Sequence, residues 1–107
     1  MIIATTDRIE GSEISEVLGM VMANTVRAKN VGRDIMAGFR NLAGGEIREY
    51  TKMLAESREI AIDRMTTRAE EMGADAIVGT RFITAGIMSS ASEIMAYGTA
   101  VKLGKKS

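Results

Sequence analysis

A long amphipathic helix that runs directly into a β-strand is the feature that most constrains how this 107-residue chain can fold. Gly44 and Gly45 precede the helix, and Gly73 supplies the left-handed residue that commonly ends one. Within Glu46–Met72, apolar residues recur on one face at about 100° per residue. This stripe comprises Ile47, Tyr50, Leu54, Ala61, Met65 and Met72, and Ala55, Ile62 and Ala69 widen it. Such a helix can bury only one face of a sheet.

Four segments have the composition of β-strands. Ile2–Thr5 is expected to be a short first or edge strand, and Val17–Arg27, Ala76–Ala85 and Glu93–Leu103 to be longer strands. In the second segment one face would hold Val17, Val21 and Ala23 and the other Leu18, Met20, Met22 and Val26, with a bulge at Gly19. In the third, Ala76, Val78, Thr80 and Phe82 would oppose Ile77, Gly79, Arg81 and Ile83. In the last, Met95, Tyr97, Thr99, Val101 and Leu103 would oppose Ile94, Ala96, Gly98 and Ala100.

These elements predict a single α+β domain spanning residues 1–107. It would contain a small antiparallel or mixed sheet, the long helix, and a shorter helix over Arg33–Leu42. The three longer strands are largely apolar on both faces, and one helix covers only one of those faces. We therefore expect the chain to bury the other face by self-association.

The composition excludes several classes of function. Lys plus Arg and Asp plus Glu each total 14, and this balance argues against binding to nucleic acid or to an anionic membrane. The N-terminal sequence has neither the basic start nor the long apolar core of a secretory signal, and no apolar run approaches the roughly 20 residues of a membrane helix. A cytoplasmic location is the expectation.

The chain contains no cysteine and no histidine, so it has neither thiolate nor imidazole ligands for a metal. A metal could be held only by carboxylates, carbonyls or the thioethers of the nine methionines. Thioethers suit a soft ion such as Cu(I). However, Met20, Met22, Met53, Met65, Met72 and Met95 also occupy periodic positions that are typical of core packing.

Two arginines stand among apolar neighbours. Arg58 is predicted near the centre of the long helix's apolar face, and Arg81 lies within the third strand. A buried guanidinium needs a partner, for which Glu93 and Glu46 are candidates. Such pairs would either fix the register of assembly or form an anion-binding pocket at a subunit junction.

The chain also resembles a known family. The motifs Gly32-Arg33-Asp34, Gly44-Gly45-Glu46-Ile47, Gly73-Ala74-Asp75-Ala76 and Ala96-Tyr97-Gly98-Thr99-Ala100-Val101 resemble those of the YbjQ-like family, which is often labelled heavy-metal-binding. The resemblance covers nearly the whole chain. It implies a dodecin-like α+β subunit that assembles into a ring, a homopentamer, and it implies no established reaction.

The favoured hypothesis is a non-enzymatic homo-oligomer that serves as a scaffold or binds a small ligand or ion. One alternative is a metal-binding or metal-sensing ring, and another is an enzyme whose site is completed across subunits by Arg33, Arg81, Glu93 or Tyr97. No catalytic residue and no cofactor can be named, because Ser89, Ser90 and Ser92 have no histidine to activate them. The candidate ligand-binding residues are Arg33, Asp34, Glu46, Arg58, Arg81, Glu93 and Tyr97.

Overall fold

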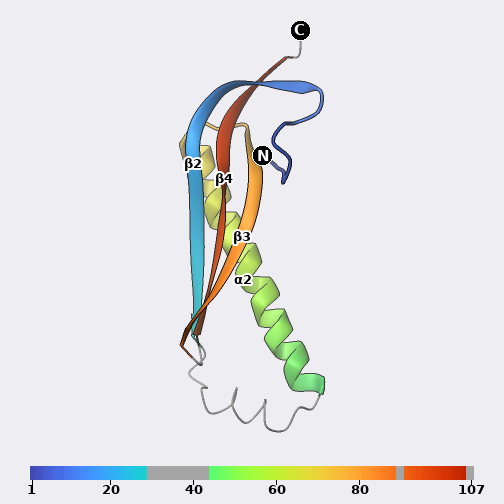
Figure 1. The fold of residues 1–107 in the computed structure, drawn as a ribbon, viewed down its shortest axis with the longest axis vertical. Coiled ribbons are helices and arrows are strands. Elements are labelled where there is room, and N and C mark those ends of the chain that lie inside the picture. Colours follow the sequence, from blue (N-terminus) through green and yellow to red (C-terminus); the bar gives the residue numbers. More distant parts are fainter. Residues whose placement is uncertain (29–43, 89–90, 106–107) are drawn as a thin grey trace.

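The computed structural model describes residues 1–28, 44–88 and 91–105, and the side chains of 1–26, 51–86 and 92–105. These residues form an α+β fold, which confirms the predicted class (Figure 1). The strands are β1 (Ile2–Ile3), β2 (Ser12–Ala28), β3 (Ala76–Met88) and β4 (Ala91–Lys105), and the helix is α2 (Gly44–Glu71). The shorter helix predicted over Arg33–Leu42 lies outside the described residues.

The sheet is mixed, with the strand order β1-β3-β4-β2. β1 runs parallel to β3 as the predicted short edge strand, and the other neighbouring strands are antiparallel. β2 begins at Ser12 rather than at Val17, because the polar residues before Val17 pair with the end of β4 and so satisfy their backbone groups. β3 also ends later than predicted, at Met88, and β4 begins earlier, at Ala91. These two residues pair with each other.

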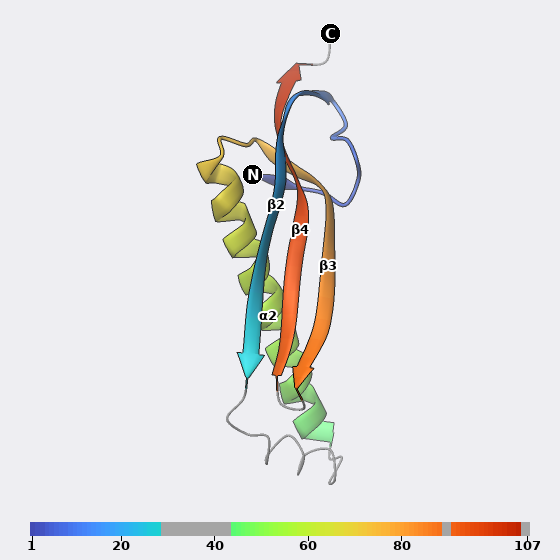
Figure 2. The same ribbon diagram turned by 60° about the vertical axis from the view of Figure 1, so that its left-hand side comes forward.

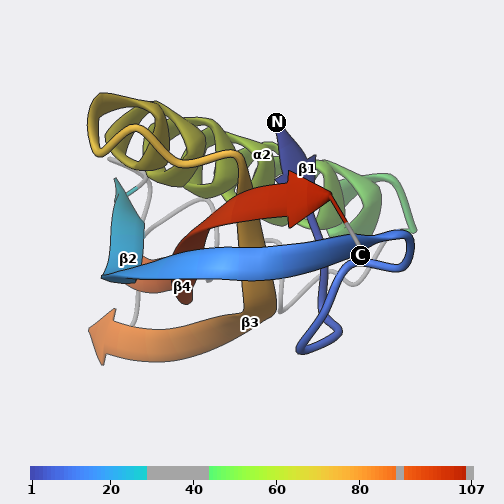
Figure 3. The same cartoon turned by 90° about the horizontal axis from the view of Figure 1, so that it is seen from above.

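Helix α2 lies along one side of the sheet, which we call the inner face (Figures 2 and 3). The main core forms between them from Val21, Ala23, Ala61, Met65, Ala69, Ile77, Ile94, Ala96 and Ala100. A second, smaller core contains Ala76, Val78 and Val101, covered by Ile9, Ile14 and Leu103. Because Ala76 and Val78 flank Ile77 in one strand, this second core lies on the opposite side of the sheet.

Two bulges change which side chains share a face. The predicted bulge at Gly19 is confirmed by a register shift between Val17 and Gly19 and by the residue's φ of +133°. Leu18 therefore packs against the inner core and Val17 is exposed, which reverses their predicted positions.

The second bulge, between Val78 and Arg81, includes Gly79 with a φ of +62° and was not predicted. Thr80 lies with Ile77 beside Gly98, so it is on the inner face, whereas Val78 belongs to the opposite core. The prediction that Val78 and Thr80 share a face was wrong, because the extra residue shifts the alternation.

The prediction of a helix over Glu46–Met72 is confirmed to within two residues at its start and one at its end. Its buried stripe follows a four-residue step through Ser57, Ala61, Met65 and Ala69. Each such step turns about 40° further around the helix, so the stripe drifts across the twisted sheet. Arg58 and Met72 are exposed as a result, and their predicted positions on the apolar face were wrong.

The glycine cap that was predicted at the end of α2 is also confirmed. Gly73 has a φ of +82°. Its N–H donates to the Glu70 carbonyl at 2.9 Å, and the Ala74 N–H donates to the Ala69 carbonyl at 3.0 Å. This pair of bonds is the Schellman arrangement, which turns the chain from α2 towards β3.

Candidate functional site

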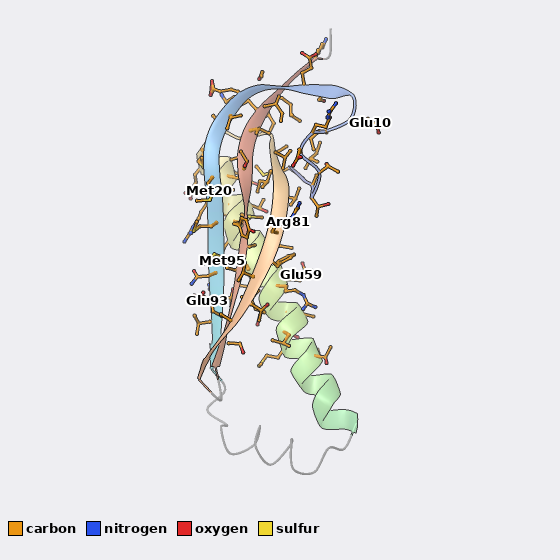
Figure 4. All side chains as sticks on the ribbon, in the orientation of Figure 1. Glu10, Met20, Glu59, Arg81, Glu93 and Met95 are labelled. Atoms are coloured by element: carbon orange, nitrogen blue, oxygen red, sulfur yellow. The ribbon has the colours of Figure 1, made fainter. Side chains whose placement is uncertain are left out.

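The candidate site is the side of the sheet that faces away from α2, beyond the second core. Paired residues of antiparallel strands share a face, and the register defines three rows across β2, β4 and β3. The rows are Met22–Tyr97–Arg81, Asn24–Met95–Ile83 and Val26–Glu93–Ala85, and Met20 beside Thr99 adjoins them. We call these eleven residues the outer face. Figure 4 shows Met20, Met95 and Glu93 along the β2–β4 pair and Arg81 on β3.

Large apolar side chains on the outer face are open to solvent. Met20 is 66% exposed, Val26 51%, Ile83 50% and Met22 37%. By contrast, the end of the sheet that carries the second core is covered by Ile9, Ile14 and Leu103. A contiguous exposed apolar patch on a folded domain marks an interaction surface.

Two polar residues are bonded to each other within this patch. The Asn24 Nδ2 donates to the Glu93 Oε2 at 3.1 Å, between neighbouring strands β2 and β4. A neutral amide therefore holds one carboxylate oxygen in place without cancelling its charge. This arrangement gives the patch a negatively charged group beside Met95 and Val26.

Arg81 is the cationic residue of the outer face, and it is bound to the backbone. Its Nη1 donates to the Thr5 carbonyl at 2.9 Å and to the Thr80 carbonyl at 2.8 Å. These bonds fasten the segment after β1 to β3. The side chains of Arg81 and Glu93 therefore bond to different partners, although Glu93 was a predicted partner for Arg81.

The outer face brings together three of the seven candidate ligand-binding residues, namely Arg81, Glu93 and Tyr97. Arg58 is exposed on α2 and belongs to a different surface. Arg33 and Asp34 lie outside the described residues, and so does the side chain of Glu46.

Sequence reasoning missed Asn24 and the exposure of the methionines on β2. The alternation of Met20, Met22, Asn24 and Val26 after the Gly19 bulge was the available signal, because it places all four on one face. What the pattern could not show was which of two apolar faces the helix covers.

The metal chemistry open to this chain is narrow. Among the side chains that the structure describes, no group of three or more Asp or Glu residues could hold a metal, and His and Cys are absent from the whole sequence. Thiolate and imidazole sites are therefore excluded, and thioether sulfur is the soft donor that the chain offers. Across the same described part of the chain, no helix has both the length and the apolar character needed to cross a membrane.

Comparison with known proteins gives a family but no activity. The YbjQ family model, described as "Putative heavy-metal-binding", matches residues 1–104. Similar relatives share the name "UPF0145 protein". The relative from Psychromonas ingrahamii is 58% identical over 105 residues, which are 98% of this chain and all of the relative. The relative from Thermotoga maritima is 55% identical over 105 residues, which are 98% of this chain and 99% of the relative.

A solved structure also shares the fold. It is a protein of unknown function from Pediococcus pentosaceus, assigned to the DUF74 family, with a TM-score of 0.69. The match covers 97% of this chain and 98% of that one at 18% sequence identity. Since the identity is low, the likeness concerns the fold alone.

Proposed function

This chain belongs to the YbjQ-like family, and we propose that it is a non-enzymatic protein that assembles into a homo-oligomeric ring. The ring is a pentamer in this proposal, as the family resemblance implies. The outer face of each subunit meets a different surface of the next subunit, because a ring of five is built from head-to-tail contacts. It acts in the cytoplasm as a scaffold or as a binder of a small ligand or ion.

The observation that carries the proposal is the exposed outer face. Val26 and Ile83 would each remain about half in water in an isolated subunit. Transfer of apolar surface out of water contributes about 25 cal/mol per Å², so contact between copies through this patch is favourable. Tyr97 and Met95 supply the aromatic and thioether side chains that are enriched in protein interfaces.

Native mass spectrometry of the purified protein tests the assembly. We expect a pentamer for the natural sequence and a monomer for Ile83→Glu, because a carboxylate within the interface would be buried without a partner. Met72→Glu is the matched control, since Met72 is also exposed but lies at the end of α2. A natural protein that stays monomeric at micromolar concentration contradicts the proposal.

A metal-binding or metal-sensing ring is the alternative function, and the family description favours it. Carboxylate groups such as Glu93 would have to converge from several subunits to hold a divalent ion. Equilibrium dialysis against Zn, Cu, Ni and Cd, followed by elemental analysis, distinguishes this function from that of a metal-free scaffold.

A further inference from the structure

The outer face gathers three of the chain's methionines. Met20 and Met22 are two residues apart on β2, so their Cα atoms are about 6.6 Å apart on the same side of the strand. Met95 lies on β4, where it pairs with Asn24 of β2. It is therefore the diagonal neighbour of Met22, at a distance of about 7–8 Å. Met22 thus stands between two other thioethers. Each methionine side chain has three rotatable bonds, which allows neighbouring sulfur atoms to converge.

The other described methionines are arranged differently. Met65 is fully buried in the main core, Met53 is half-buried on α2, and Met1 and Met72 are exposed but are not among the residues of the outer face. In the isolated subunit Met20 and Met22 are both exposed on the outer face and belong to no core. An ion bound to their sulfur atoms would therefore lie where the proposed function places the contact between subunits.

Charges of both signs surround these thioethers. Glu93 is two residues before Met95 on the same face of β4, and its carboxylate accepts a hydrogen bond from the neutral amide of Asn24. The one arginine of the outer face, Arg81, is held on β3 by the carbonyls of Thr5 and Thr80. β4 separates that strand from Met20 and Met22. Arg64 and Arg68 donate to the Asn24 and Met22 carbonyls at the edge of β2, so the donor atoms, and not the local charge, select the ion.

From this arrangement we infer that the outer face binds a soft monovalent cation, Cu(I) or Ag(I), through the thioether of Met22 together with that of Met20 or Met95. Thioether ligands select such ions. Divalent ions such as Zn²⁺ are not retained, because the whole chain lacks the thiolate and imidazole groups that they prefer. The inference rests on the proposed function, in which the chain binds an ion and its subunits meet at the outer face, and it specifies the ion and its ligands.

Titration with Ag(I), which needs no reductant, tests the inference on the whole chain. In NMR spectra of methionine methyl groups, we expect saturable shifts of the Met20, Met22 and Met95 signals and none of Met65 or Met72. Zn²⁺ should shift none of them. Met22→Leu should weaken Ag(I) binding at least about tenfold, and Met72→Leu should leave the affinity unchanged. Leucine nearly conserves the volume of methionine, and circular dichroism of each variant verifies its fold.

Three results would overturn the inference: Ag(I) affinity that Met22→Leu leaves intact, equal shifts at Met72, or tight binding of Zn²⁺. Native mass spectrometry without metal reports the assembly separately. A ring that fails to bind Ag(I) therefore refutes only the ion site, whereas a monomer that binds Ag(I) refutes only the ring.

Discussion

Gly98 is the position in β4 where a side chain has the least room. A Cβ atom there would lie 2.6 Å from the Ile77 Cγ2, 3.0 Å from the Val78 carbonyl oxygen and 3.3 Å from the Thr80 Oγ1. Two of these three atoms belong to β-branched side chains, which have little freedom to turn away. The glycine therefore allows β3 to retain its bulge directly beside β4.

Gly98→Ala should lower the free energy of unfolding by about 1–3 kcal/mol, the usual range for overpacking a core. Gly86→Ala is the matched control, because a Cβ at Gly86 of β3 would meet no atom within 4 Å. Urea denaturation of both variants measures the difference. Equal stabilities of the two variants would show that the sheet adjusts around residue 98 without cost.

At the scale of elements, periodicity predicted the helix and all four strands, and glycine chemistry predicted the cap at Gly73 and the bulge at Gly19. The bulge that includes Gly79 was not predicted, although a glycine within a strand was the same signal that indicated the bulge at Gly19. That single extra residue decides that Arg81 shares the outer face with Tyr97, so the composition of the site depends on it. The candidate site could therefore be predicted only in part, because the side of the sheet on which Arg81 lies depends on a bulge that was not predicted from the sequence.

Helix α2 contacts the edge of the sheet through two arginines that sequence patterns did not single out. Arg64 Nη1 donates to the Asn24 carbonyl at 2.9 Å, and Arg68 Nη1 donates to the Met22 carbonyl at 2.5 Å. β2 is an edge strand, so its outward carbonyls would otherwise be free to pair with another chain. The two guanidinium groups occupy that edge beside the outer face.

Replacing both arginines, Arg64→Ala with Arg68→Ala, should reduce the free energy of unfolding by about 1 kcal/mol per lost hydrogen bond. Arg58→Ala serves as the control, because Arg58 is exposed on the same helix and surface substitutions stay within about 0.5 kcal/mol. Chemical denaturation compares the two proteins. If the double variant were as stable as Arg58→Ala, the bonds to β2 would contribute nothing net.

At the scale of the whole molecule, the subunit exposes more surface than a self-contained domain of its size. It measures 60 × 22 × 16 Å, with a radius of gyration of 17.5 Å against about 13 Å for a compact domain of this length. Its accessible surface is 7115 Å², whereas a monomer of 11.5 kDa is expected to have about 5,800 Å². The excess of about 1,300 Å² is enough for a standard interface, which buries about 800 Å² on each partner.

An assembly that covers this surface makes folding depend on concentration. Subunit association stabilises the native state by mass action, so the midpoint temperature of unfolding should rise as the protein concentration is raised. Ile83→Glu should remove this dependence and lower the midpoint, because the separated subunit leaves Val26, Met20 and Met22 in water. Differential scanning calorimetry over about a hundredfold range of protein concentration provides the comparison. Met72→Glu should retain the rise. A midpoint that is independent of concentration in the natural protein would mean that the elongated subunit is stable alone, and that its outer face serves a partner other than itself.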